Sequence, residues 1–266
     1  MAFRLTFLGT GSSGGVPRIG NVWGVADPSN PRNRRRRCAV LVERFGPHGR
    51  TVVLIDTPPD LRDQCLEHDV AYIDATLYTH DHADHTHGID DLRVFALTQR
   101  RRIPCYMDDI TWQSLYLRFK YCFERKENSN YVPILSREPL VPGELTVIEG
   151  KGGPIPILPV LQDHGELPSL GFRIGNLCYS PDIVGVPAAS EQYLQDLDLW
   201  IVDALRPTPH PSHWSVKQAL AAIEKYGAKR AILTHMHIDL DYDTLARQLP
   251  PHVVPAYDGM TVDFSI

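Results

Sequence analysis

The feature that most constrains this chain is a cluster of histidines directly after a short apolar run. Residues 75–78 are apolar and predict a buried strand, and the next seven residues read Thr79-His80-Asp81-His82-Ala83-Asp84-His85. Three imidazoles and the carboxylate of Asp84 therefore fall within six residues at the end of a strand. Divalent first-row metals prefer this nitrogen and oxygen ligand set. Loop histidines are often merely solvated, but this HxHxDH spacing favours a metal site.

A site for two metals needs further donors from distant parts of the sequence. His164, Asp182 and His235 each follow an apolar run that predicts a strand. Because loops at strand ends gather into sites, we expect these three side chains to lie near the histidine motif. Asp56 also follows an apolar run. It is expected either to orient a ligand histidine or to serve as a helix cap or turn residue.

The pattern of the remaining chain predicts mixed α/β (α+β layered) architecture. Early hairpins and later strand–helix alternation argue for packed layers of both element types. Expected strands cover 3–8, 38–42, 51–55, 75–78, 154–161, 171–179, 199–202, 230–233 and 253–254, and expected helices cover 60–67, 111–123, 215–226 and 242–248. No repeat or linker divides the chain, so we expect one domain over residues 1–266. The poorly patterned stretch 124–150 is the best candidate for an insertion near a substrate site.

Composition excludes several classes of protein. The formal net charge is −5, which excludes a globally basic nucleic-acid coat but permits a local basic patch. No apolar stretch approaches the roughly 18 residues that span a bilayer, and the start, MAFRLTFLGT, lacks a signal-peptide pattern. The 5 cysteines are widely spread and form no pairing framework. We therefore expect a cytoplasmic protein without membrane partners.

The histidine motif followed by His164, Asp182 and His235 resembles the metallo-β-lactamase superfamily. Within it the chain is most similar to the phosphodiesterase branch, which includes ribonuclease Z and the cyclic phosphodiesterase of phosphonate breakdown. The glycine-rich segment Phe7–Pro17 and the later Pro209-His-Pro-Ser-His-Trp-Ser215 carry this likeness, which runs on to Val254–Met260. The resemblance implies an αββα sandwich, with two mixed β-sheets face to face and helices outside.

The same resemblance implies a role for each motif residue. One divalent metal would take His80, His82 and His164, the other would take Asp84, His85 and His235, and Asp182 would bridge them. The two ions would be zinc or manganese. His213 would be the catalytic proton donor, alongside Asp84 as a catalytic residue, with His210 as its neighbouring rival or a substrate contact. Arg93, just past the motif, would contact phosphate, whereas His87 and His237 have no assigned role.

One departure from the phosphonate-pathway enzymes concerns a structural zinc. Those enzymes carry a cysteine cluster soon after the glycine-rich turn. Here the corresponding loop, residues 17–37, has no cysteine, and Ala26 stands where one is expected. We therefore predict that this chain lacks a separate structural zinc site.

Two other motifs have competing interpretations. Gly9-x-Gly11-x-x-Gly14 matches the dinucleotide-binding fingerprint, but the residues after it do not predict the helix that would receive the pyrophosphate. A tight turn near the metal site is the better interpretation. The runs Arg34–Arg37 and Arg100–Arg102 could bind phosphate, although charge runs are usually solvated faces.

Together these features predict a binuclear metal-dependent hydrolase of phosphodiester bonds, acting on a small cyclic nucleotide or ribosyl phosphate. One alternative is a thioester or lactone hydrolase, because the metal ligands alone do not define the bond. Another is a transfer RNA 3′-processing endonuclease, which the acidic balance disfavours, so RNA is the less favoured partner. A non-enzymatic alternative is a redox di-iron module. Redox relatives typically carry glutamate in place of the second histidine of the motif, and His82 is a histidine here, which disfavours this alternative. A homodimer is compatible with the sequence.

Overall fold

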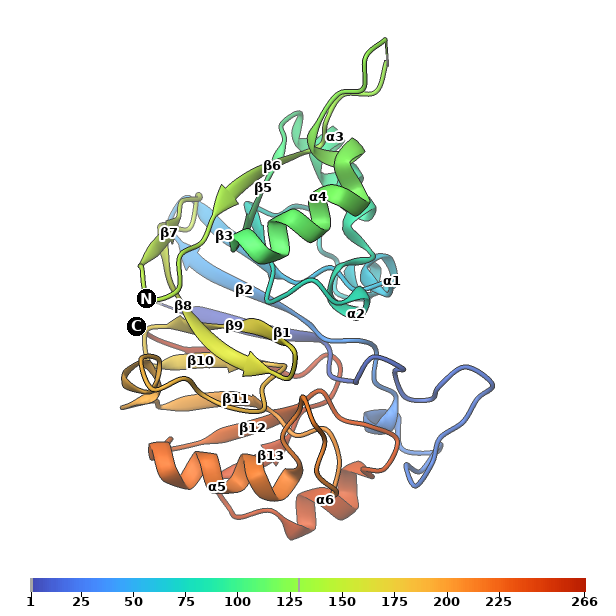
Figure 1. Cartoon of the computed structure of the whole chain (residues 1–266), viewed down its shortest axis with the longest axis vertical. Helices are drawn as coiled ribbons and strands as arrows, with labels where there is room; N and C mark the ends of the chain where they lie inside the picture. The colour runs from blue at the N-terminus through green and yellow to red at the C-terminus, as the bar shows by residue number, and fades with distance from the viewer. Residues whose placement is uncertain (1, 129) are drawn as a thin grey trace.

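A computed structural model describes residues 2–128 and 130–266, and it contains two mixed β-sheets that lie face to face between layers of helices (Figure 1). The first sheet has the strand order β14 (Thr261–Phe264), β1 (Phe3–Gly9), β2 (Ala39–Gly46), β3 (Gly49–Ile55), β4 (Ala75–Leu77), β5 (Ile103–Met107) and β6 (Leu135–Pro139). The second has the order β13 (Val253–Pro255), β12 (Ala231–Thr234), β11 (Leu199–Asp203), β10 (Leu177–Ser180), β9 (Leu167–Ile174), β8 (Ile155–His164) and β7 (Thr146–Ile148).

Helices cover the outer face of each sheet, which confirms the expected αββα sandwich. The first sheet is accompanied by α1 (Leu61–Glu67), α2 (Ala83–Thr86), α3 (Leu92–Gln99) and α4 (Asp109–Phe123), and the second by α5 (Val216–Tyr226) and α6 (Tyr242–Gln248). Short 3₁₀ turns occupy Pro31–Asn33, Ile89–Asp91 and Glu191–Leu194. No helix in the described part of the chain is long and apolar enough to cross a membrane.

Side-chain alternation along the strands builds the core on both faces of the first sheet. In β2, Val40 and Val42 join the cluster that fills the space between the sheets, whereas Leu41 joins the cluster beneath α1, α3 and α4. This period of two is what an extended strand dictates. On the second sheet, α5 buries one apolar stripe and begins with a capping box at Ser215, where side chain and backbone satisfy each other's hydrogen bonds.

The strand directions bring the predicted donors to one edge of the sandwich. Strands β3 to β6 are mutually parallel, as are β10 to β13. β8 runs in the same direction as β10, since both are antiparallel to β9. In Figure 1 the arrowhead of β8 points to the side of the molecule where α2 lies. Loops at the carboxyl ends of β3, β4, β8, β10, β11 and β12 therefore meet there.

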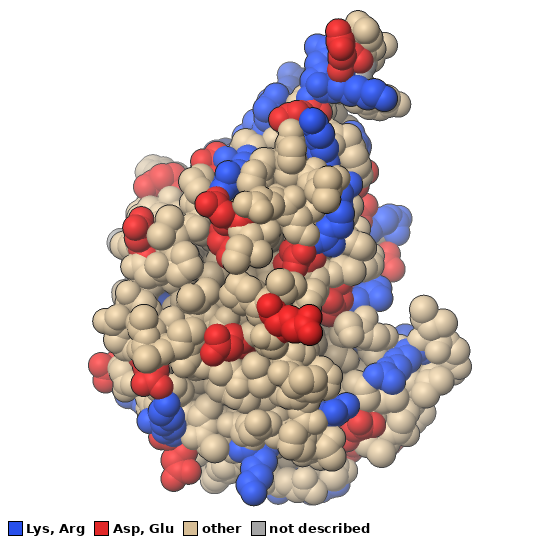
Figure 2. Space-filling view, in the orientation of Figure 1, with Lys and Arg blue, Asp and Glu red and all other residues tan. Residues whose placement is uncertain are grey.

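The structure differs from the sequence-based prediction at several places, and it adds α2, α3, β5 and β14, where no element was expected. The single strand expected over 171–179 is the end of β9 and most of β10, separated by a turn in which Gly175 has a positive φ of 58°. The stretch 124–150, expected as an insertion, contains β6 and β7, which form one edge of each sheet. Edge strands carry weaker apolar patterns because one side of each stays open. Residues 124–128 and 130–134, between α4 and β6, project as an arm (Figures 1 and 2).

Candidate metal centre

Six histidines and several aspartates gather at the common edge of the two sheets. All seven predicted ligand residues lie in this cluster: His80, His82, Asp84, His85, His164, Asp182 and His235. His80 and His82 lie in the loop after β4, while Asp84 and His85 belong to the short helix α2. The remaining three come from the ends of β8, β10 and β12. That these residues bind metal stays a prediction, for which the geometry supplies the following support.

The first predicted ligand set is compact. One nitrogen from each of His80, His82 and His164 lies within 4.8 Å of the others. His164 Nε2 is 3.2 Å from His82 Nδ1. Two imidazole nitrogens at this distance are suitably placed to share one metal ion, since Zn–N distances are about 2.0–2.1 Å.

The second predicted set is equally compact and adjoins the first. Donor atoms of Asp84, His85 and His235 also lie within 4.8 Å of one another. The Asp84 carboxylate is 3.6 Å from His85 Nε2 and 3.7 Å from His235 Nε2. Asp84 therefore faces both imidazoles, as a shared ion would require.

Asp182 lies between the two sets. One of its carboxylate oxygens is 3.1 Å from His85 Nε2, and the other is 3.4 Å from His235 Nε2 and 3.6 Å from His164 Nε2. The Asp182 carboxylate is 2% exposed, and it lies close to histidines of both ligand sets. This is the position that a bridging ligand would occupy.

Unsatisfied polar atoms show that the cluster fits cations. Among residues 2–128 and 130–266, His80 Nε2 and His235 Nε2 are buried and have no hydrogen-bond partner, and His85 Nε2 and Asp182 Oδ1 face each other at 3.1 Å without the geometry of a hydrogen bond. Buried polar atoms in native proteins are nearly always satisfied, so these four converging donors need a binding partner. Metal ions would satisfy all of them.

Hydrogen bonds on the far side of the rings orient three of the histidines. Asp56 accepts a 2.7 Å hydrogen bond from His85 Nδ1, and it also accepts from the Thr79 amide and hydroxyl at 2.9 Å. Asp56 thus takes the orienting role that its position after β3 suggested. His164 Nδ1 lies 2.7 Å from the Ser212 carbonyl, and His80 Nδ1 lies 3.0 Å from the Thr79 hydroxyl. Such partners fix the ring orientation of metal-binding histidines.

Burial and charge set the protonation of the cluster. Burial lowers the pKa of His164 to about 4 and the pKa of His80 well below its ordinary value. Both imidazoles are therefore neutral at neutral pH, which is the form that binds metal. Burial alone would raise the pKa of Asp182, but the neighbouring His235 and His85 hold it well below the usual range.

His213 is paired with an aspartate that the sequence-based prediction missed. Asp203, the last residue of β11, is fully buried and lies 2.7 Å from His213 Nδ1. Burial raises the pKa of Asp203 and lowers that of His213, as expected for two buried groups that share a proton. The His213 ring stacks on His235 with centroids 4.6 Å apart. The missed signal was an aspartate directly after an apolar strand, the same pattern that identified Asp182.

The predicted substrate contacts occupy different places. The His210 ring lies beside His213, with centroids 5.2 Å apart. Arg93 is not in the donor cluster, because it lies on α3 and forms a 2.6 Å ion pair with Asp90.

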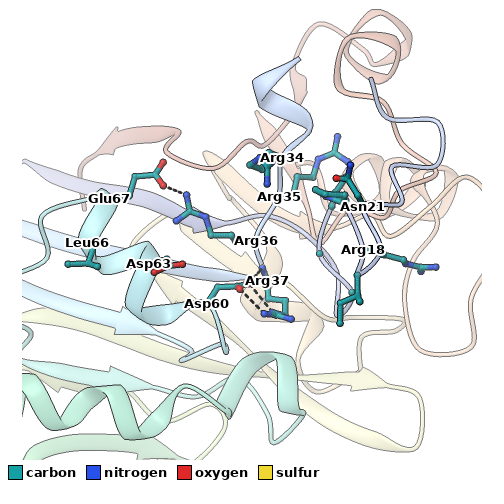
Figure 3. Close-up of a pocket in the computed structure, with 16 residues that line it drawn as sticks. Arg18, Asn21, Arg34, Arg35, Arg36, Arg37, Asp60, Asp63, Leu66 and Glu67 are labelled. Atoms are coloured by element: carbon teal, nitrogen blue, oxygen red, sulfur yellow. Dashed lines mark hydrogen bonds and ion pairs between the residues drawn. The ribbon is translucent and has the colours of Figure 1, made fainter. Parts of the chain in front are cut away.

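The run Arg34–Arg37 lines a pocket of about 850 Å³ (Figure 3), and most of its side chains form hydrogen bonds or ion pairs within the protein. Arg35 is buried and donates to the Leu240 carbonyl at 2.8 Å. Arg36 pairs with Glu67, and Arg37 pairs with Asp60 at 2.6 Å. The glycine-rich turn packs tightly against the same segment, since a Cβ at Gly9 would lie 2.0 Å from the Arg37 carbonyl oxygen. A tight turn is therefore the correct interpretation of this motif.

Comparison with known proteins identifies the family. The sequence pattern of the beta-lactamase superfamily domain matches residues 51–236, which include the whole donor cluster. The chain belongs to the metallo-β-lactamase superfamily. The family and its donor cluster make the chain a metal-dependent hydrolase domain, and both predictions drawn from the resemblance, superfamily and fold, are confirmed.

Individual members of the superfamily show how far the likeness extends. The crystal structure of a diphosphatase from the PhnP family is 36% identical, has a TM-score of 0.88, and covers 99% of this chain and 98% of that one. This match confirms the resemblance to the phosphodiesterase branch. The short form of human tRNase Z is 18% identical with a TM-score of 0.60 over 99% of this chain and all of that one, which shows the shared fold.

A curated relative differs in length. A Porphyromonas gingivalis (strain ATCC BAA-308 / W83) protein named octanoyltransferase is 31% identical over 263 residues, or 97% of this chain. The chain spans about half (51%) of that relative's length.

Proposed function

We propose that this metallo-β-lactamase domain hydrolyses phosphodiester bonds in small anionic substrates, with cyclic nucleotides and ribosyl phosphates as the leading class. The observation that carries the proposal is the His213–Asp203 pair beside the donor cluster. Nδ1 of His213 faces Asp203 at 2.7 Å, which leaves Nε2 as the nitrogen that can reach a substrate. A proton donor at this place suits an alkoxide leaving group, and the 36% identity to a diphosphatase supports phosphorus chemistry.

The donor cluster is proposed to hold two divalent ions, zinc or manganese. His80, His82 and His164 would hold one, Asp84, His85 and His235 the other, and Asp182 both. When bound, such ions lower the pKa of coordinated water to about 7 and neutralise charge on phosphoryl oxygens. The protein's part is to fix the ligand rings, through Asp56, Thr79 and the Ser212 carbonyl.

His213 would then deliver a proton to the leaving oxygen. Asp203 orients its ring through the 2.7 Å contact with Nδ1, and the two groups share one proton within the pair. A positioned acid of this kind contributes about 10²–10⁴-fold to rate. His210 lies close enough to assist, and it is the rival for this role or a substrate contact.

The acidic overall balance means that the substrate must be held locally. Figure 2 shows acidic and basic side chains interspersed over the visible face of the body and also on the arm. With a net charge of −5, the protein's overall field repels anions. Small substrates gripped at the metal centre fit this surface better than a long RNA does.

Turnover of a substrate panel after metal reconstitution tests the proposal. The panel contains bis(p-nitrophenyl) phosphate, 2′,3′-cyclic nucleotides, pre-tRNA, thioesters and lactones, each with zinc and with manganese. The highest kcat/KM is expected for the small phosphodiesters. Thioester or lactone turnover far above phosphodiester turnover would refute the proposal. A preference for pre-tRNA would show that the substrate is RNA and not a small phosphodiester.

A further inference from the structure

Helix α4 contacts the histidine motif on the side that faces away from the metal centre. Asp81 stands between His80 and His82, and successive side chains on extended backbone point to opposite sides. The Asp81 carboxylate accordingly faces α4 and accepts a hydrogen bond from the Ser114 hydroxyl. The same carboxylate oxygen is 2.8 Å from Nη2 of Arg118, one turn further along the helix.

The Arg118 guanidinium contacts two points of the motif. Its Nη2 lies 2.7 Å from the Asp81 carbonyl oxygen and 2.6 Å from the Ser114 hydroxyl. Its Nη1 lies 3.3 Å from Nε2 of His87, just beyond the motif. The Arg118 side chain is 31% exposed and that of Asp81 is 19% exposed, so solvent screens this ion pair only partly. A planar guanidinium can hold several acceptors at once in a fixed geometry, which an ammonium cannot.

Among the described residues, His235 and His82 are the ligand histidines without a hydrogen-bond partner that orients the ring, and of these two His82 is the exposed one. His80, His85 and His164 each have a polar partner that orients the ring, namely the Thr79 hydroxyl, Asp56 and the Ser212 carbonyl. Within the described ranges, the His82 ring has its hydrogen-bond contact with another ligand, His164. His82 is also exposed, so packing restrains it little. Its direction must therefore come from the backbone on which it sits, and Arg118 holds that backbone at Asp81.

We propose that Arg118 is a positioning residue that, through Asp81, sets the metal affinity of the His80–His82–His164 site. The inference rests on the proposed two-metal centre and assigns no substrate contact to Arg118. Losing a residue that orients metal ligands typically costs about 10–100-fold in metal affinity. Since Arg118 contacts the loop that carries His80 and His82, the loss of metal affinity should be confined to one of the two sites.

Stepwise titration of metal-free protein with Co²⁺ tests this proposal. Wild-type protein, Arg118→Ala, Arg118→Lys and the control Lys120→Ala are compared. Lys120 lies on the same helix, is 62% exposed and pairs with Glu124. Arg118→Ala should weaken one binding step by about 10–100-fold and leave the other unchanged. Arg118→Lys should fall between Ala and wild type, and Lys120→Ala should match wild type.

Several results would overturn the proposal. Unchanged affinity at both sites in Arg118→Ala would show that the contact between Arg118 and Asp81 does not affect metal affinity. Equal weakening of both sites, together with a lowered Tm of the metal-free protein, would show a merely structural role. Wild-type protein that binds fewer than two ions would instead refute the two-metal centre itself, so the two failures are distinguishable.

A double-mutant cycle tests the route through Asp81. If Arg118 acts through that carboxylate, Asp81→Asn combined with Arg118→Ala should weaken the site no more than Arg118→Ala alone. Additive losses would mean that Arg118 acts by another path and would refute the assignment.

Discussion

Removing the Asp56 carboxylate should damage both the metal-free fold and one metal site. Asp56 is fully buried and accepts three hydrogen bonds, from His85 Nδ1 at 2.7 Å and from the Thr79 amide and hydroxyl at 2.9 Å. Each of the three buried donors left without an acceptor costs about 1–3 kcal/mol, so Asp56→Ala should lower the free energy of unfolding by about 3–9 kcal/mol. Asp56 also has a positive φ of 65°, which alanine tolerates less well than aspartate or asparagine.

The assay separates these effects. Urea unfolding with a chelator present measures the metal-free fold, and metal titration measures the site that contains His85, where affinity should fall by about 10–100-fold. Asp56→Asn keeps one acceptor oxygen and tolerates the backbone, so it should be less damaging to folding than Asp56→Ala. The reasoning is refuted if Asp56→Ala unfolds at the wild-type urea concentration and binds metal with wild-type affinity.

Three further predictions follow from other buried contacts. Asp203→Asn should keep both metals and lower phosphodiester kcat by about 10²-fold or more, measured with bis(p-nitrophenyl) phosphate, because His213 loses the carboxyl group that orients its ring and shares its proton; unchanged kcat would contradict the pairing. Burial raises the pKa of Asp258 to about 7, so this carboxyl stabilises the fold fully below its unfolded pKa near 4 and loses that contribution as pH rises through 7. Wild-type stability should therefore fall relative to Asp258→Asn between pH 4 and 7, by about 2–4 kcal/mol in urea unfolding, and a pH-independent difference would refute it. Gly9→Ala should destabilise by about 1–3 kcal/mol or more, because its Cβ would meet the Arg37 carbonyl oxygen; wild-type stability would rule out that clash.

The donor cluster could be predicted from the sequence because each ligand lies at or shortly after the end of an apolar run. His164, Asp182 and His235 are separated by long stretches of chain, yet each marks the carboxyl end of a strand, and strands of like direction bring those ends together. Asp203 follows the same rule at the end of β11. It was missed because a lone aspartate after a strand is also an ordinary turn residue.

The rest of the site depends on pairings that only the folded chain reveals. Arg93 lies close to the motif in sequence, but Asp90 is three residues away on the same helical turn and pairs with it. Arg118 looked like any charge on a helix surface until the fold placed α4 against Asp81. Likewise β6 and β7 read as irregular sequence because edge strands need little apolar patterning.

The most direct test of the account compares metal content and turnover in His213→Ala. Metal-reconstituted wild-type protein should contain two ions and hydrolyse bis(p-nitrophenyl) phosphate. His213→Ala should also contain two ions and should lose about 10²-fold or more in kcat, while His210→Ala should lose less. Loss of one ion from His213→Ala would make His213 a ligand, and wild-type kcat would show that it donates no proton; either result would contradict a two-metal centre with a separate acid.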